Sequence, residues 1–313
     1  MLRSIVRITC AFFLIATFIS AQQPASAPPP APGSPADLVQ QGQKLSRDGK
    51  LDDALALYHQ ALDKAPNLYE AHLGAGVVLD LKGDYTEAHE QFTKAIAVAP
   101  ADSNGQAQRA MAVSYAFEGN TFKAAEYETQ VFNARLAKHD TVGAAEICNE
   151  LARIYLDAGD ADNAHKWYKM GYNTATKKTD LTDADRRLWL FRWESAQARI
   201  AARRDNADDA KQHMAAAKTA LDDAKNPDQM KFYPYLTGYV ALYTGDPKIA
   251  IEALQQADQH DPMVLALLGQ AYEKSAYAPL AKGCYEKVLE INSHNPANAY
   301  ARPLAKKKLS GGA

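Results

Sequence analysis

A stretch near the beginning of the chain repeats, and this repeat constrains the fold more than any other feature of the sequence. Residues 42–66 (GQKLSRDGKLDDALALYHQALDKAP) align with residues 76–100 (GVVLDLKGDYTEAHEQFTKAIAVAP) at a constant offset of 34 residues. The paired positions share a residue type, whether small, turn-forming, aromatic or proline: Gly42 and Gly76, Gly49 and Gly83, Ala54 and Ala88, Tyr58 and Phe92, Ala61 and Ala95, and Pro66 and Pro100. A fixed period of this length indicates a stack of repeated structural units.

Each repeat has the pattern of two short helices joined by a tight turn. In the first unit, Leu51, Leu55, Tyr58 and Leu62 recur at the spacing of one helix face. A glycine separates the two halves, and a proline ends the second half because it cannot continue a helix. One helix pair cannot bury its apolar face alone, so we expect neighbouring pairs to stack into a solenoid.

This pattern resembles the tetratricopeptide repeat (TPR), a helix–turn–helix unit in which small residues let two helices pack closely. The resemblance covers about residues 36–295 and implies an all-α fold, a right-handed α-solenoid of about seven helix pairs. The small residues that mark the first helix of each unit are Gly42, Gly76, Ala112, Ala152, Ala198, Gly238 and Gly269. The predicted units lie near 35–68, 69–102, 103–140, 141–178, 182–225, 227–261 and 262–295, followed by a capping helix at 296–309 and a tail at 310–313.

Units three to six are longer than the family standard of 34 residues. The added sequence is rich in Ala, Arg, Lys and Leu, which favour helix, so we expect extra helical turns rather than structureless loops. The fifth unit has Asp205 and Asn206 at its turn. The register of units three and five stays open. We expect the capping helix to have a polar outer face, which solenoid ends require, and Pro303 to kink or interrupt it.

The N-terminal segment reads as an export signal. Residues 1–21 combine Arg3 and Arg7 with an apolar run of about 12 residues, followed by small residues up to Ala21, the pattern of a cleaved signal peptide. An uncleaved anchor is the alternative, but a membrane-spanning helix needs roughly 20 apolar residues. Cys10 lies at the start of the apolar run, so no lipid anchor is expected. Residues 22–35 are rich in Pro and Ala and indicate a linker. We therefore expect a bacterial protein that is periplasmic or secreted.

Composition and motifs argue against several functional classes. A formal net charge of -2 argues against a general nucleic-acid binder, and only 3 Cys residues exclude a four-cysteine zinc site. His89 and Glu90 lack the second histidine of a zinc protease, and no phosphate-binding glycine loop or nucleophile elbow is present. Cys148 and Cys284 are expected to be small buried hydrophobic residues. We expect no enzyme, no cofactor and no metal site.

The resemblance also identifies where a partner would bind. One version of the family binds chaperone C-termini through Lys, Asn and Arg residues on its first three units. The equivalent positions of the first two units hold Val39, Gln43 and Gly74, and the third unit offers only polar uncharged residues or alanine there. We therefore reject a cationic clamp of that kind.

A different groove surface is predicted from the first helices of later units. If these helices line the concave face, as the resemblance implies, unit six presents a tyrosine stripe and the two preceding units present basic and amide side chains. The predicted groove residues are Asn149, Arg153, Arg192, Arg199, Arg203, Phe232, Tyr235, Tyr239 and Tyr243. Tyr and Arg together suit a peptide with acidic and apolar side chains. Under this hypothesis the tyrosines are partly exposed. The same spacing is more often that of residues packed between helices, so core packing remains the alternative.

Two functional hypotheses follow. The first is a non-catalytic scaffold that binds a partner protein or peptide in the concave groove. The second is a structural component of a cell-envelope assembly that self-associates, as a homo-oligomer, without a groove ligand. An exposed tyrosine-rich groove favours the first hypothesis, and an apolar patch on a terminal repeat favours the second. An enzyme or small-ligand binder is disfavoured, because the sequence has no constellation of polar residues for chemistry.

Overall fold

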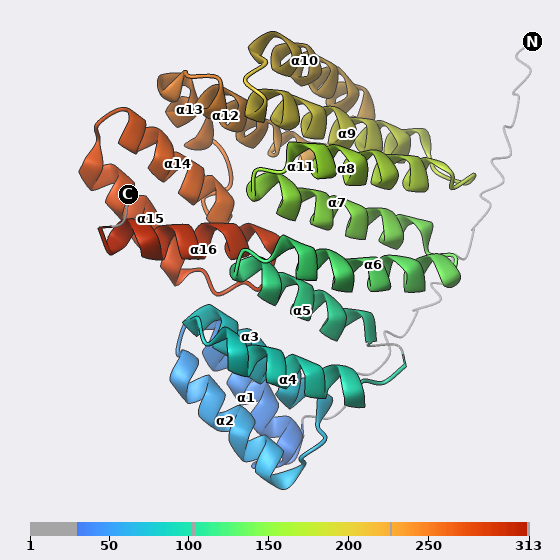
Figure 1. Cartoon of the computed structure of the whole chain (residues 1–313), viewed down its shortest axis with the longest axis vertical. Coiled ribbons are helices and arrows are strands. Elements are labelled where there is room, and N and C mark those ends of the chain that lie inside the picture. The colour runs from blue at the N-terminus through green and yellow to red at the C-terminus, as the bar shows by residue number, and fades with distance from the viewer. Residues whose placement is uncertain (1–29, 102–103, 226, 312–313) are drawn as a thin grey trace, which may run out of the picture.

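The computed structural model describes residues 30–101, 104–225 and 227–311, and within these residues every regular element is a helix (Figure 1). The predicted signal peptide, residues 22–29 of the predicted linker and the last two residues of the tail lie outside the described residues. None of the described helices is long and apolar enough to span a membrane.

The helices follow one another as antiparallel pairs. The pairs are α1 (Pro35–Arg47) with α2 (Leu51–Lys64), α3 (Tyr69–Lys82) with α4 (Tyr85–Val98), α5 (Asn104–Phe117) with α6 (Thr121–Ala137), α7 (Thr141–Asp157) with α8 (Ala161–Thr176), α9 (Asp183–Arg203) with α10 (Ala207–Ala224), α12 (Tyr233–Tyr243) with α13 (Pro247–Leu254), and α14 (Pro262–Lys274) with α15 (Ala278–Glu290). The short helix α11 (Pro227–Met230) precedes α12, and α16 (Pro296–Leu309) ends the chain. Each pair packs on the next, which gives the predicted all-α solenoid (Figure 1).

The repeated glycines are explained by close contact with the repeated aromatic rings. Phe92 of α4 is fully buried against α3, and a Cβ atom added at Gly76 would lie 2.6 Å from its Cε1 atom. The same relation recurs in the last pair, where a Cβ atom at Gly269 would lie 2.7 Å from Tyr285 Cε1. Atoms in an ordinary van der Waals contact are farther apart, so only glycine lets the aromatic ring lie this close to the helix backbone.

The turns within the pairs require a left-handed backbone residue. Gly83 ends α3 with a φ of 100°, a conformation that glycine adopts without a steric penalty. The fifth pair has no glycine at this position, and Asp205 takes the left-handed conformation instead, with a φ of 57°. Asn206 then caps α10, because its side chain accepts a hydrogen bond from the Asp209 N–H group. This turn sets the register of the fifth unit, which the sequence pattern leaves open.

The extra residues of the middle units lengthen their helices, with one exception. Helices α6 and α7 have 17 residues each, α9 has 21 and α10 has 18, compared with 14 in α3 and α4. The expectation of extra helical turns is wrong for the sixth unit, because α12 has 11 residues and α13 only 8. There the additional residues form α11 and the connections on either side of it.

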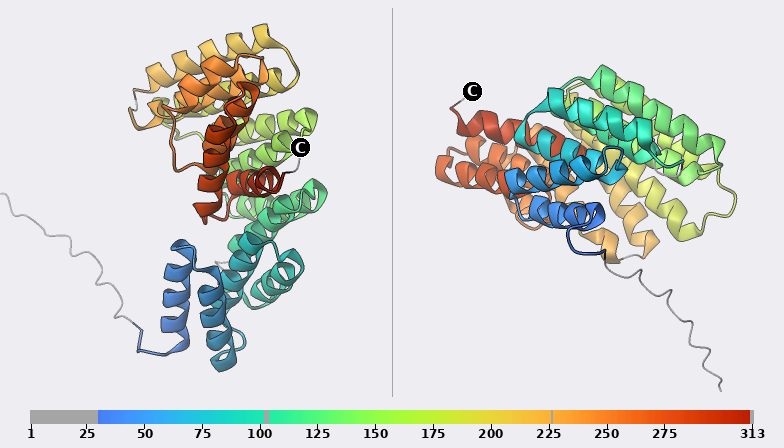
Figure 2. Two further views of the ribbon diagram at one scale, coloured as in Figure 1. Left: turned by 90° about the vertical axis from the view of Figure 1, so that its left-hand side faces the viewer. Right: turned by 90° about the horizontal axis from the view of Figure 1, so that it is seen from below.

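The C-terminal helix differs most from the prediction. Helix α16 occupies the predicted range and Pro303 lies inside it, but it is not a cap with one outward polar face. It packs on α14 and α15 and also on α5 and α7, so it lies between the last pair and the middle of the solenoid (Figures 1 and 2). Ala299 of α16 belongs to one apolar cluster with Leu81, Val113 and Phe117. The solenoid therefore closes on itself through its C-terminal helix.

Buried polar contacts fix this closure. Arg302 Nε donates to the Leu81 carbonyl oxygen at 2.9 Å, and its Nη1 donates to the carbonyl oxygens of Leu289 at 3.0 Å and Ile291 at 3.2 Å. These carbonyl groups belong to the C-terminal ends of α3 and α15, where helix carbonyls lack partners within their own helix. One guanidinium group thus joins the ends of two helices that are more than 200 residues apart in the chain.

A buried carboxylate provides the second closing contact. Asp80 of α3 is almost completely buried and accepts a hydrogen bond of 2.6 Å from Ser114 Oγ. His294 Nε2, from the connection between α15 and α16, lies 2.7 Å from the other carboxylate oxygen of Asp80. The imidazole ring packs between the rings of Phe92 and Phe117. The second and third units are therefore tied directly to the connection that precedes α16.

Arg302→Ala should lower the free energy of unfolding by about 2 kcal/mol or more, because one buried and two partly buried carbonyl groups lose a charged donor. Lys307→Ala is the matched control on α16, since Lys307 is exposed and its effect should be within about 0.5 kcal/mol. Chemical denaturation followed by circular dichroism measures both. An equal, small effect of the two substitutions would contradict the closing role of Arg302.

Candidate functional site

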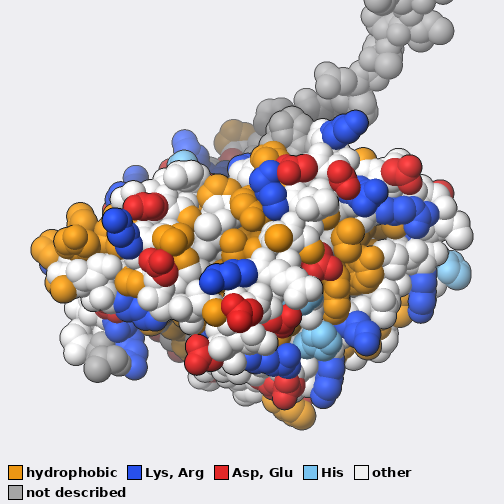
Figure 3. All heavy atoms as spheres, turned by 90° about the horizontal axis from the view of Figure 1, so that it is seen from above, with side chains coloured by type: hydrophobic (Ala, Val, Ile, Leu, Met, Phe, Trp, Pro, Cys, Tyr) orange, Lys and Arg blue, Asp and Glu red, His pale blue; other side chains and the backbone are white. Residues whose placement is uncertain are grey.

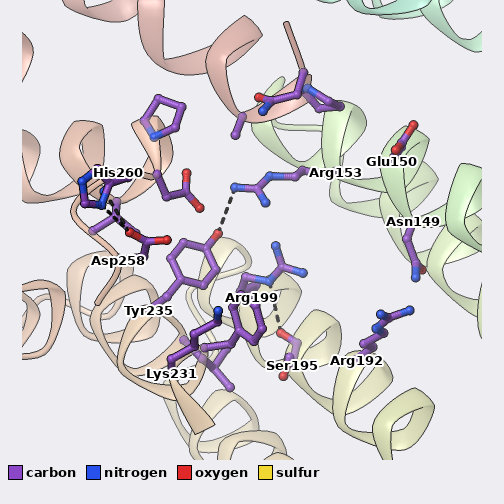
Figure 4. A pocket seen from close by; sticks show the side chains of 18 of the residues that line it. Asn149, Glu150, Arg153, Arg192, Ser195, Arg199, Lys231, Tyr235, Asp258 and His260 are labelled. Carbon is purple, nitrogen blue, oxygen red and sulfur yellow. Dashed lines mark hydrogen bonds and ion pairs between the residues drawn. The ribbon is translucent and has the colours of Figure 1, made fainter. Parts of the chain in front are cut away.

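A cavity lies where the first helices of several units meet the C-terminal segment. Its volume is about 660 Å³. Helices α7, α9 and α12 form one side, and the start of α14 and the connection from α15 to α16 form the other (Figure 4). The closure of the solenoid by α16 therefore turns an open groove into a walled cavity.

Six of the nine predicted groove residues line this cavity. They are Asn149 and Arg153 of α7, Arg192 and Arg199 of α9, and Phe232 and Tyr235 at the beginning of α12. The opposite wall includes Pro262, Val264, Ile291, Ser293 and Asn295. Sequence reasoning missed this second wall, because nothing in the repeat pattern indicates that the chain returns to the concave face after the last pair.

The other three predicted residues lie behind the cavity. The expected partial exposure is wrong for Tyr239, whose side chain is only 1% exposed and belongs to the main apolar cluster with Ile200 and Leu242. Arg203 Nη1 donates to the Tyr239 hydroxyl oxygen at 3.4 Å, and the guanidinium group lies over the ring of Tyr243. Residues of α14 and α16 pack with Tyr239 in one apolar cluster, whereas Tyr235 and Tyr243 are half-buried and keep the partial exposure predicted for them.

A buried network of charges underlies the cavity. Asp157 at the end of α7 has its carboxylate 3.6 Å from Arg153 Nε, and Arg199 and Arg203 also attract it electrostatically. Burial nevertheless raises the pKa of Asp157, because desolvation opposes its charged form more strongly than the arginines favour it. Arg153 Nη2 also reaches the Tyr235 hydroxyl oxygen at 3.5 Å (Figure 4). Arg153 thus has a carboxylate partner.

Arg199 has no such partner. Its side chain is 9% exposed, and its Nε and Nη2 atoms donate to the Ser195 carbonyl oxygen at 3.3 Å and the Tyr168 hydroxyl at 3.1 Å. The guanidinium group also lies over the rings of Tyr168 and Tyr239. Among the described residues, no carboxylate lies within ion-pair distance of it. Aromatic faces and neutral acceptors stabilise this cation without cancelling its charge.

The acidic residues of the cavity wall are already engaged. Glu150 accepts two hydrogen bonds from the guanidinium group of Arg109. Asp258 accepts from the His260 N–H group at 2.9 Å, and Asp261 caps α14 by accepting from the Met263 N–H group at 2.8 Å. In contrast, the cations Arg192 and Lys231, which also line the cavity, form no ion pair within the described chain. Asp258 and Asp261 likewise have no Lys or Arg side chain within ion-pair distance in the described chain, so the cavity wall carries charges of both signs.

Charges of both signs are also mixed on another face of the molecule. Figure 3 shows the end of the solenoid at the top of Figure 1, where Lys and Arg side chains are interspersed with Asp and Glu.

In the described part of the chain, no group of three or more His, Cys, Asp or Glu residues could hold a metal ion. Cys148 and Cys284 are buried free thiols, and burial raises the pKa of Cys148 to about 12, so it is a poor nucleophile at neutral pH.

Comparison with known proteins agrees with the helix-pair architecture. The family model of the tetratricopeptide repeat matches residues 39–128, which span α1 to the first half of α6. This segment of the chain therefore resembles the tetratricopeptide-repeat family in sequence. No curated protein matches the sequence.

Solved TPR-like structures extend the likeness in fold to most of the chain. The apo form of RapI has a TM-score of 0.56 at 12% sequence identity, covering 86% of this chain and 98% of RapI. A tetratricopeptide repeat protein from Parabacteroides merdae has a TM-score of 0.50 at 14% identity, covering 87% of this chain and 98% of that protein. At these identities the similarity shows the fold alone.

Tyr239→Ala should lower the free energy of unfolding by about 3–5 kcal/mol, because it removes a buried ring from the core. Phe232→Ala is the matched control, since Phe232 is 43% exposed at the cavity and should change stability by less than about 1 kcal/mol. Urea denaturation measures both. A loss for Tyr239→Ala no larger than for Phe232→Ala would show that the ring is not part of the core.

Proposed function

We propose that this TPR protein is a non-catalytic scaffold that binds a partner protein through a peptide segment inserted into the cavity between α7, α9, α12 and the C-terminal wall. TPR folds in general mediate interactions between proteins. The observation that carries the proposal for this chain is the convergence of six residues, selected from the sequence as partner-binding, on one cavity. Its volume is within the range of sites that enclose a compact ligand, so it suits several side chains of a partner.

The chemistry of the walls supports a peptide ligand. Phe191, Phe232, Leu236 and Val264 supply apolar surface, and Tyr235 supplies a ring with a polar end. Aromatic and arginine side chains in a concave, desolvated site are the residues that dominate binding energy at protein interfaces. Tyr239 supports this surface from behind as a core residue, and Tyr243 and Arg203 do so as half-buried residues; none of the three is assigned a contact with the partner.

Site-specific crosslinking tests the proposal. A photo-crosslinking amino acid at position 232, at the cavity, should capture a partner protein, and Tyr235→Ala in the same chain should abolish this capture. The matched control is the same crosslinker at Phe122, which is 75% exposed on α6 and does not line the cavity. Equal capture from both positions, or capture that survives Tyr235→Ala, would contradict partner binding in the cavity.

One observation favours the alternative, self-association. Tyr277, immediately before α15, and Leu280, in its first turn, are both more than half exposed on the last helix pair. The same crosslinker at position 280 distinguishes the two functions. Capture of a second copy of this chain from position 280, without capture of another protein from position 232, would support a self-associating structural role.

We further propose that the protein acts outside the cytoplasm, as its N-terminal sequence indicates. The mature chain should then begin near Gln22. N-terminal sequencing of the protein from a periplasmic or culture fraction measures this directly. Recovery of Met1 in the membrane fraction would instead indicate an uncleaved anchor.

A further inference from the structure

A fully buried carboxyl group, that of Glu128, lies on α6 where this helix packs against α5 and α7. The Glu128 side chain has no solvent exposure, and within the described chain neither of its carboxyl oxygens has a hydrogen-bond partner. An ionised carboxylate is strongly disfavoured in such a position, because burial removes its hydration and no described donor replaces it. The neutral, protonated carboxyl group is therefore the form that this packing accommodates.

The charged groups around Glu128 come from its own helix and from both helices packed on it. Arg109 of α5 donates to the carboxylate of Glu150 on α7, from Nε at 3.1 Å and also from Nη2. Arg135, on α6 itself, donates to the Asp140 carboxylate at 2.6 Å. Among the described residues, neither arginine lies within ion-pair distance of Glu128. Both guanidinium groups are thus committed to other carboxylates.

These neighbours act on Glu128 in opposite directions. Burial raises the pKa of Glu128 well above its usual value, and repulsion by the Glu150 carboxylate raises it further. Attraction by Arg109 and by Arg135 opposes this rise without reversing it. The thiol of Cys148, on the α7 side, stays neutral because burial raises its pKa to about 12. Two carboxyl groups therefore compete for Arg109, and Glu150 holds it.

The pair of Arg109 and Glu150 connects this buried group to the cavity. Glu150 lines the cavity (Figure 4), whereas Glu128 does not. While Glu128 is neutral, Arg109 balances the charge of Glu150. An ionised Glu128 places a second negative charge beside the same guanidinium group, whose planar fork fits one carboxylate at a time.

We propose that Glu128 is a proton-operated switch behind the cavity. When Glu128 is neutral, Arg109 holds Glu150; when Glu128 gives its proton to the solvent, Arg109 turns to Glu128 and the Glu150 carboxylate is released toward the cavity. A rise in pH thereby adds one uncompensated negative charge to the cavity wall. The switch belongs to the packing of α5, α6 and α7 and does not depend on whether the cavity binds a partner, so its tests need no ligand.

The pH dependence of stability tests the protonation of Glu128. The stabilisation linked to its proton is complete below the pKa of an unfolded glutamate and is lost as the pH rises through the raised pKa of the folded state. Within that interval, the unfolding equilibrium constant of the unmodified protein should rise about tenfold per pH unit relative to that of Glu128→Gln. Urea denaturation between about pH 5 and about pH 9 measures this ratio.

The matched control is Glu126→Gln, because Glu126 is exposed on the same helix and pairs with Lys123. This variant should keep the pH dependence of the unmodified protein. Parallel stability curves for the unmodified protein and Glu128→Gln would show that Glu128 is ionised in the folded state, and would overturn the proposal.

A double-mutant cycle tests the change of partner. The coupling between Arg109 and Glu150, measured from Arg109→Gln, Glu150→Gln and the double variant, should be at least about fivefold in the unfolding equilibrium constant at the low end of the pH range. It should fall to about twofold or less at the high end, and stay large at both ends when all four proteins also carry Glu128→Gln. A coupling in the unmodified background that does not change with pH would overturn the transfer of Arg109.

Infrared spectroscopy provides a measurement that requires no substitution at Glu128, in case Glu128→Gln does not fold. With isotope-labelled glutamate side chains, the unmodified protein should show the absorption of a protonated glutamate at a pH at which exposed glutamates are ionised. Glu150→Gln removes the like charge and frees Arg109, so it should move the titration of this band down by about one pH unit or more. Absence of the band, or a titration that Glu150→Gln leaves unchanged, would contradict the switch.

Discussion

The contact of Arg302 with the ends of two distant helices is the interaction on which the shape of this molecule depends. In an open solenoid each unit contacts only its neighbours, and the concave face stays open along its length. Here one buried guanidinium group binds the terminal carbonyl groups of α3 and α15, and Asp80, Ser114 and His294 reinforce the contact. The first half of the solenoid is thereby joined to its end.

The closure determines the character of the candidate site. Asn298 of α16 is fully buried and its amide donates to the carbonyl oxygens of Ile291 and Ser293, which holds the connection between α15 and α16 in place. This connection supplies the cavity wall opposite Arg153, Arg199 and Tyr235. The enclosure also increases the effect of charge, because a guanidinium group shielded from water interacts more strongly with an anion than an exposed one does. The closure of the solenoid by α16 therefore also determines how strongly the arginines of the cavity can interact with a ligand.

The sequence predicted the local structure because local structure depends on local spacing. The pairing of Gly76 with Phe92 appeared as a repeated pattern and proved to be a close helix contact. The burial of Tyr239 could not be predicted in the same way, because one helical spacing serves a groove and a core alike. What buries Tyr239 is the position of α14 and α16, and contacts such as Arg302 with Leu81 have no counterpart in the repeat pattern. Arg199 lines the cavity as the sequence predicted, but its burial and its lack of a direct ion pair are properties of the three-dimensional arrangement.

Native-state hydrogen exchange of the unmodified protein tests the closure most directly. A terminal helix that merely caps the last pair opens locally, with a free energy far below that of global unfolding. If α16 joins the end of the solenoid to α3 and α5, the amides of Ala301 and Ala305 should exchange through the same opening, with the same free energy, as those of Met111 and Val113 in α5. Exchange of the α16 amides through a separate opening of much lower free energy, with α5 still protected, would contradict the account.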